Sequence, residues 1–134
     1  QKQIKNLPNN IIGIEKIKEK ALLAKYYRNS NLFINFSIEE TFGLTTVESM
    51  SCGTPVIVYN STACPEIVSE GTGFIVEKYD IPAVRKIINN LKSNLEHIVS
   101  SEKCVKWVHE KFNSKDRFNE YVKLYSNTVN NTKK

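Results

Sequence analysis

The sequence contains little of what metal sites and disulfide frameworks require. Its 134 residues include three cysteines, Cys52, Cys64 and Cys104, at irregular spacing and without a C-x-x-C pair. An odd, irregular set argues against a disulfide framework. The two histidines lie far along the chain from Cys52 and Cys64, which argues against a zinc site. We therefore expect three reduced thiols, most of them buried.

Long hydrophobic runs are also missing. No apolar run approaches the roughly 20 residues that a membrane-spanning helix needs, and the residues after Gln1 do not resemble a signal peptide. The expected location is the cytoplasm. A G-x-G-x-x-G fingerprint is absent from the sequence, which disfavours a nicotinamide-binding domain.

The net charge of +5 is divided unevenly along the chain. Residues 1–30 carry +5, residues 31–80 carry −6 and residues 81–134 carry +6. A nucleic-acid-binding protein usually concentrates basic residues around its motifs, whereas the motif-rich centre here is acidic. We therefore expect no nucleic-acid partner and interpret the flanking lysines as solvated helix faces. A weak, peripheral attraction to an anionic membrane surface at the inner membrane face stays open.

Short apolar runs alternate with helical patterns through the first half of the chain. This order predicts one α/β domain with a parallel sheet of about four strands, flanked by helices. Gly53 is expected to end a helix in the left-handed conformation, and Ser114 to cap the last helix. The predicted strands are 11–14, 32–36, 55–59 and 73–76; the predicted helices are 16–28, 44–52, a turn at 65–66, and three apolar stripes within 84–91, 104–112 and 118–125.

The ends of the chain carry weaker signals. Residues 1–10 look like a connection from a preceding segment, so residues 1–134 are interpreted as a single partial domain whose N-terminal part is missing. The polar tail at 127–134 is expected to fray.

The stretch from the second predicted strand to the following helix has the features of an anion site. A turn that leads from a parallel strand to a helix lies at the edge of the sheet where ligands bind. Gly43 allows a ligand to approach the backbone, and the free N–H groups from Gly43 to Thr46 offer donors to a diphosphate. Glu40 and Glu48 flank this turn. Since carboxylates accept hydrogen bonds from hydroxyl groups, a sugar nucleotide would satisfy both.

The same residues carry a family resemblance. Glu40-Thr-Phe-Gly-Leu-Thr-Thr-Val-Glu48 resembles the E-x7-E signature of retaining glycosyltransferases, particularly glycosyltransferase family 4. The similarity continues through Ser49-Met-Ser-Cys-Gly-Thr-Pro-Val56, Pro65-Glu-Ile-Val68 and Gly73-Phe-Ile-Val76, and covers about residues 10–126. Ala63 stands where the family commonly has glycine, so the loop before Pro65 is expected to bend differently.

This resemblance implies a GT-B fold, of which the chain would be the C-terminal, donor-binding domain, Rossmann-like in architecture. Glu48 would bind the ribose hydroxyls and Glu40, the catalytic candidate, the donor sugar. The backbone N–H groups of Phe42, Gly43, Leu44 and Thr45 would face the sugar and diphosphate. The family's diphosphate-binding Arg and Lys and its acceptor domain would precede this chain, so these residues alone are expected to be inactive.

The activity implied is retaining transfer of a hexosyl group from a nucleotide sugar to a polysaccharide or glycolipid acceptor, held by the N-terminal domain. No cofactor or metal is expected, since no Asp-x-Asp is present. Two alternatives remain: a related GT-B enzyme, such as a glycogen- or sucrose-type synthase or a sugar-nucleotide epimerase, and a nucleotide-binding module without catalysis. Trp107 and the tyrosines at helical spacing are interpreted as core residues.

Overall fold

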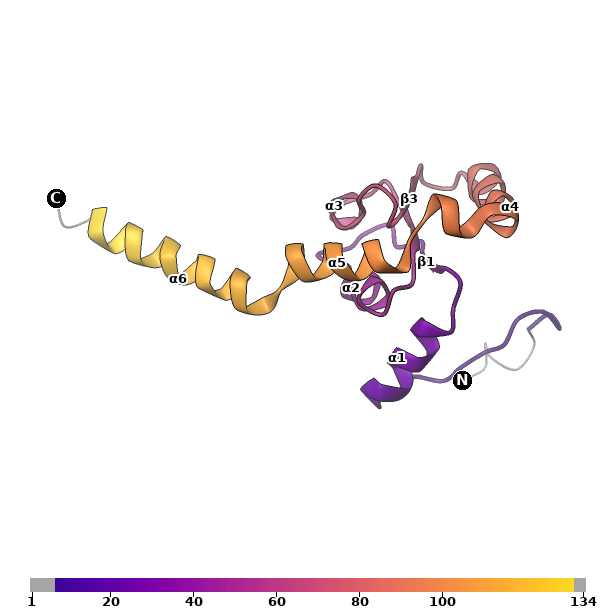
Figure 1. Cartoon of the computed structure of the whole chain (residues 1–134), viewed down its shortest axis with the longest axis horizontal. Helices are drawn as coiled ribbons and strands as arrows, with labels where there is room; N and C mark the ends of the chain where they lie inside the picture. The colour runs from indigo at the N-terminus through magenta and orange to yellow at the C-terminus, as the bar shows by residue number, and fades with distance from the viewer. Residues whose placement is uncertain (1–6, 132–134) are drawn as a thin grey trace.

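The computed structural model describes residues 7–131, apart from the side chains of residues 93–98 and 131. The elements follow one another as α1 (Lys20–Arg28), β1 (Phe33–Asn35), α2 (Leu44–Ser51), β2 (Val56–Tyr59), α3 (Cys64–Ile67), β3 (Gly73–Val76), α4 (Ile81–Ile98), α5 (Ser101–Phe112) and α6 (Ser114–Asn131). Helices pack around a small sheet, and α6 projects away from this body (Figure 1). The predicted α/β class is confirmed.

Within residues 7–131 the sheet has three strands in the order β1-β2-β3, and both pairings are parallel. Phe33 lies opposite Val56, and Val56 lies opposite Gly73. The predicted strand at 11–14 is wrong. Ile12 is 86% exposed, and no strand among the described residues pairs with this run, so its backbone has no ladder to join.

β2 is central and buried along its whole length. Its side chains alternate between two apolar layers, as the two-residue period of a strand requires. Val56 and Val58 face a cluster with α2, α3 and α5, whereas Ile57 and Tyr59 face a cluster with α4. Since Val56, Ile57 and Val58 have no exposed surface, each contributes about 1.5–3 kcal/mol of burial.

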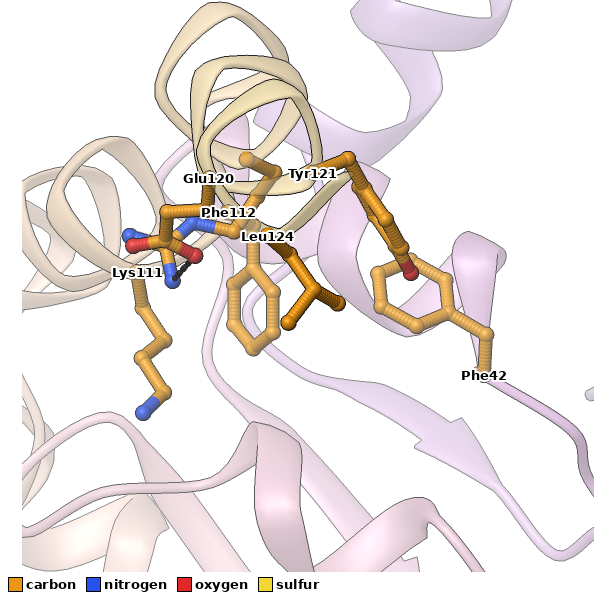
Figure 2. Close-up of a pocket in the computed structure, with 7 residues that line it drawn as sticks. Phe42, Lys111, Phe112, Glu120, Tyr121 and Leu124 are labelled. Carbon is orange, nitrogen blue, oxygen red and sulfur yellow. Dashed lines mark ion pairs between the residues drawn. The ribbon is translucent and has the colours of Figure 1, made fainter. Parts of the chain in front are cut away.

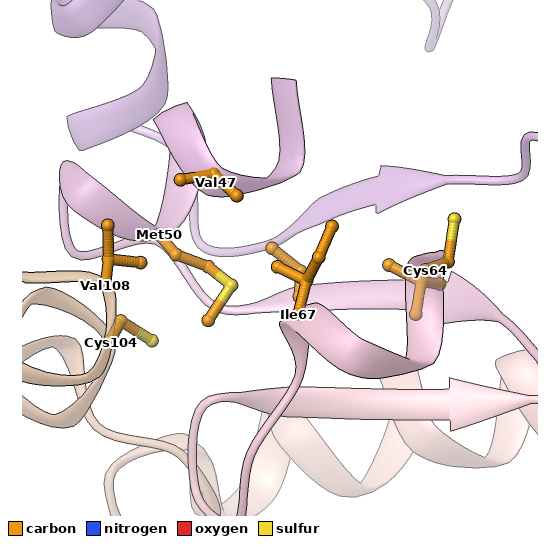
Figure 3. Packing of buried hydrophobic residues seen from close by; sticks show 8 residues of the cluster. Val47, Met50, Cys64, Ile67, Cys104 and Val108 are labelled. Atoms are coloured by element: carbon orange, nitrogen blue, oxygen red, sulfur yellow. The ribbon is translucent and has the colours of Figure 1, made fainter. Parts of the chain in front are cut away.

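The first cluster fixes α2 in place. Met50 of α2 packs with Ile67 of α3 and with Cys104 and Val108 of α5 (Figure 3). The Trp107 indole N–H donates to the Ile67 carbonyl at 2.7 Å. Burial raises the pKa of the Cys104 thiol to about 11, so this cysteine packs as a neutral group. The three cysteines are free, as expected, and Cys52 is the half-buried one.

The helix boundaries correct three predictions. α1 begins at Lys20 rather than residue 16. Asn113, not Ser114, caps α6. Its side-chain oxygen accepts from the Lys115 N–H at 3.0 Å, and an N-cap side chain commonly accepts from the N–H two residues later. The tail predicted to fray from 127 continues α6 to Asn131, and residues 132–134 lie outside the described residues, as do residues 1–6 of the predicted connection.

The third apolar stripe is not part of the core. Phe118 and Tyr125 are each 67% exposed, and Tyr121 is 61% exposed. These side chains have helical spacing because α6 is amphipathic, but α6 extends beyond the sheet and its flanking helices (Figure 1). The interpretation of these tyrosines as core residues is therefore wrong for the described residues, whereas Trp107 does pack against the core.

Candidate functional site

The start of α2 has free backbone donors. Gly43 is the N-cap, with φ +79°, and no described side chain forms a capping hydrogen bond with the helix. Its carbonyl accepts from the N–H groups of Thr46 at 2.9 Å and Val47 at 3.2 Å. The N–H groups of Leu44 and Thr45 have no partner among residues 7–131. Because the first turn also carries the positive end of the helix dipole, these two groups are suited to an anion.

The left-handed conformation explains why glycine stands at position 43. A side chain in this region of φ is strained. A Cβ on Gly43 would also lie 2.5 Å from Cδ1 of Ile67 and 3.5 Å from Cγ of Glu40. The glycine therefore allows both α3 and the Glu40 side chain to lie against the helix start. The approach of a ligand to the Gly43 backbone, which the sequence pattern predicts, stays a prediction.

Glu40 is half-buried and its main chain is held by the segment after β2. Its N–H donates to the Thr62 hydroxyl oxygen at 3.0 Å, and its carbonyl accepts from the Ala63 N–H at 3.5 Å. The Ser61 hydroxyl donates to the carbonyl of Ile38. The loop before α2 is thus bound to residues 61–63. Burial raises the pKa of the Cys64 thiol, and the nearby Glu40 carboxylate raises this pKa further.

Asn35 connects the end of β1 to the same helix. Its side-chain amide donates to the Thr46 hydroxyl at 3.0 Å, and its oxygen accepts from the Ser37 N–H at 3.1 Å. Thr46 is fully buried. Asn35 therefore fixes the strand end, the following loop and the first turn of α2 relative to one another. A polar residue at the end of an apolar strand is the signal that sequence reasoning missed.

Glu48 lies one turn inside α2 and faces α1. The Tyr27 hydroxyl donates to its Oε2 at 3.4 Å. Burial raises the pKa of Tyr27, and the Glu48 carboxylate adds to this shift, so the phenol stays protonated as a donor. Tyr27 is held by packing against Phe33 and by the Thr54 hydroxyl, which donates to its carbonyl at 2.5 Å. The sequence gives no local signal for this contact, because its two partners are 21 residues apart.

Phe42 leaves the helix start in another direction. Its ring packs edge-to-face on Phe112, with 5.7 Å between centroids. The two rings line an open cavity of about 490 Å³ together with Tyr121 and Leu124 of α6 (Figure 2). Arg117 and Glu120, ion-paired at 2.9 Å, lie at its edge. The structure thus brings Glu40, Gly43, Leu44 and Thr45 together, with Glu48 a turn away and the Phe42 ring turned toward α6.

Neither a metal-binding cluster nor a membrane-spanning helix is found among residues 7–131. No three His, Cys, Asp or Glu side chains in this part of the chain lie close enough together to hold a metal ion. None of the helices between residues 7 and 131 is both long and apolar enough to cross a membrane.

Comparison with known proteins decides the family. The family model of the glycosyl transferases group 1 matches residues 1–123. The chain belongs to this family. The match covers the sheet, α2 and α3, and therefore every residue that the sequence placed in the site. This agrees with the resemblance carried by the stretch from Glu40 to Val56.

Two similar proteins illustrate the range of the chain's relatives. The chain is 30% identical over 113 residues to the N-acetyl-alpha-D-glucosaminyl L-malate synthase of Bacillus anthracis. The aligned region covers 83% of the chain and 30% of that enzyme. The chain is 33% identical over 108 residues to CapM of Staphylococcus aureus, a capsular polysaccharide biosynthesis glycosyltransferase, with coverages of 75% and 27%. The chain therefore spans less than a third of either relative.

A solved structure shares the fold. HepE of Anabaena, crystallised in complex with UDP, superposes with a TM-score of 0.70 at 21% identity, covering 77% of the chain and 29% of HepE. This likeness shows the fold, the α/β architecture of a GT-B glycosyltransferase domain. The predicted fold class is confirmed by this superposition together with the parallel sheet.

Proposed function

We propose that this chain is the donor-binding domain of a retaining glycosyltransferase, which transfers a hexosyl group from a nucleotide sugar to a polysaccharide or glycolipid acceptor. The observation that carries the proposal is the start of α2. There two N–H groups that have no partner among the described residues meet a left-handed glycine and the Glu40 side chain. The chain belongs to a family whose members transfer sugars. Capsule biosynthesis by CapM and the UDP in HepE are consistent with this donor and acceptor.

The site suggests a distinct role for each group. The N–H groups of Leu44 and Thr45, with the helix dipole, would bind the diphosphate and stabilise the charge that develops on it as the glycosidic bond breaks. Glu40 would hold the donor sugar, and Glu48 the ribose hydroxyls, with Gly43 and the Phe42 backbone facing the sugar. In this proposal further cations come from the rest of the protein, and no metal ion takes part.

The proposal also concerns the protein beyond these residues. An acceptor-binding domain would hold the polysaccharide or glycolipid, because proximity of donor and acceptor supplies much of the catalysis. Residues 1–134 alone would therefore bind donor without transferring it. A glycolipid acceptor would bring the protein to a membrane surface as a peripheral protein, which flotation with anionic vesicles would detect.

The test is acceptor-dependent release of nucleoside diphosphate by the whole protein, with the anomeric configuration of the product read by proton NMR. The proposal predicts turnover with retention only when a glycan or glycolipid acceptor is present. Inversion would refute the retaining mechanism. Donor binding without turnover on any acceptor would favour the alternative, a nucleotide-binding module.

A further inference from the structure

Thr62 has an unusual backbone conformation beside the site. Its φ is +47°, in the left-handed region that β-branched residues rarely adopt because their side chains crowd the backbone. Such strain persists only where the surroundings impose it, and it gathers at functional sites. Thr62 is exposed, so core packing does not impose its conformation.

The surroundings that fix Thr62 lie on either side of it in sequence. Ser61 is buried, with its N–H donating to the Tyr59 carbonyl at 2.8 Å and its own carbonyl accepting from Cys64 at 3.1 Å. Cys64 and Ile67 of α3 are buried in the core. The segment is therefore anchored at both ends, and the left-handed turn at Thr62 directs its hydroxyl toward the loop that carries Glu40.

Glu40 needs such support because it lies outside regular structure. Its loop, residues 36–42, joins β1 to the N-cap of α2 and belongs to no strand or helix. Two hydrogen bonds hold both main-chain groups of Glu40. Its N–H donates to the Thr62 hydroxyl at 3.0 Å, and its carbonyl accepts from the Ala63 N–H at 3.5 Å. Glu40 and Thr62 are 22 residues apart in sequence.

We propose that Thr62 is a positioning residue: its hydroxyl accepts the Glu40 N–H and thereby sets the Glu40 carboxylate against the start of α2. This inference rests on the proposed function, in which Glu40 holds the donor sugar. Its effect is on the reacting geometry rather than on nucleotide affinity. The groups proposed to hold the diphosphate and ribose, Leu44, Thr45 and Glu48, lie on α2 and, among the described residues, form no hydrogen bond with Thr62.

The experiment compares three substitutions in the whole protein. Thr62→Val keeps the shape but removes the hydroxyl, Thr62→Ser keeps the hydroxyl, and Thr62→Gly removes both hydroxyl and strain. Loss of one hydrogen bond predicts a kcat roughly two- to tenfold lower for Thr62→Val and Thr62→Gly, with the donor KM unchanged. Thr62→Ser should stay near wild type.

Stability separates positioning from a structural role. Because glycine adopts positive φ without strain, Thr62→Gly should unfold at the same temperature as wild type or higher while its kcat falls. A merely structural residue would lose activity and stability together. The matched control is Thr128→Val, which removes an exposed hydroxyl bonded to the Leu124 carbonyl at 2.9 Å in α6 and should leave kcat unchanged.

A double variant tests whether Thr62 acts through Glu40. If it does, Glu40→Gln with Thr62→Val should be no slower than Glu40→Gln alone. A wild-type kcat for Thr62→Val and Thr62→Gly, or losses that multiply in the double variant, would overturn the inference while a slow Glu40→Gln left the proposed function standing. Wild-type rates for Glu40→Gln would overturn both.

Discussion

Glu40 and Glu48 are eight positions apart, yet the structure holds them by different means. Glu48 belongs to α2, so its backbone is set by the helix and only its carboxylate needs a partner, which is Tyr27 at 3.4 Å. Glu40 lies on a loop, and its main chain is held by Thr62 and Ala63. One glutamate is placed by local geometry and the other by tertiary contacts. In the proposed function, the first would hold a fixed nucleoside and the second a reacting sugar.

The largest effect is expected at Gly43, where the two regions meet. Gly43→Ala would strain the left-handed N-cap and press on Ile67 and Glu40, so both glutamates would shift relative to the helix start. A displacement of about 1 Å at a reacting centre can lower the rate by a factor of roughly 100. We expect kcat/KM for donor to fall by about that factor, measured by steady-state kinetics of the whole protein.

Gly71→Ala is the matched control for this strain. Gly71 has φ +77°, and its Cβ would meet the side chain of Lys103 rather than the site. Both variants should lose about 1–2 kcal/mol of stability, but only Gly43→Ala should lose activity. Equal kinetic losses in the two variants would assign the effect to general destabilisation.

Glu40→Gln should lower kcat more than it raises the donor KM. The carboxylate is proposed to hold the reacting ring, so its loss acts on the transition state. Removing one charge-assisted hydrogen bond corresponds to about 1.5–3 kcal/mol, or roughly one to two powers of ten in kcat. Steady-state kinetics at varied donor would measure this, with Glu39→Gln, an exposed neighbour on the same loop, as control.

Glu48→Gln should give the opposite pattern. Its proposed partner, the nucleoside, does not change during the reaction, so the donor KM should rise by roughly tenfold while kcat changes less. Glu110→Gln on the exposed face of α5 controls for loss of a surface charge. If Glu48 instead controlled kcat and Glu40 controlled KM, the donor would lie in the reverse direction across the site.

The smallest effect is expected for Tyr27→Phe, which removes only the hydroxyl that donates to Glu48. The donor KM should rise by about two- to fivefold with kcat unchanged, whereas Tyr26→Phe, the exposed neighbour on α1, should behave as wild type. An effect on kcat equal to that of Glu40→Gln would show that the two glutamates are not held separately.

Wild type and Tyr27→Phe should also differ in how their stability depends on pH. Burial first, and the Glu48 carboxylate next, raise the pKa of Tyr27 above 10.0. The folded protein therefore keeps this proton to higher pH than the unfolded chain, so the stability it contributes is present below pH 10 and is lost as pH rises through the raised pKa. Urea unfolding above pH 10 should show wild type losing stability relative to Tyr27→Phe.

The contrast between the glutamates also explains what the sequence could predict. β2, β3 and α2 were predicted to within a residue or two because their apolar residues are buried where the pattern places them. The strand predicted at 11–14 was wrong because an apolar strand also needs a partner strand. The stripe on α6 misled because amphipathicity specifies a face without specifying what covers it.

The site divides in the same way. Glu40, Gly43 and Glu48 could be found from local spacing, but the sequence did not predict the positive φ of Gly43. The contacts of Tyr27, Asn35 and Thr62 could not, because their partners are 21, 11 and 22 residues away. These contacts depend on how α1 and α3 pack against the rest of the domain, and a local sequence pattern does not predict that packing.

The central claim is that the start of α2 binds the diphosphate of the donor. The most direct measurement is the amide NMR signal of Leu44 in the whole protein labelled with ¹⁵N-leucine, assigned with Leu44→Met and titrated with UDP, the nucleotide present in the HepE crystal. The account predicts a saturable shift of the Leu44 amide, reduced in affinity by Glu48→Gln and unaffected by Glu39→Gln. Saturable UDP binding that leaves the Leu44 amide unmoved would contradict it.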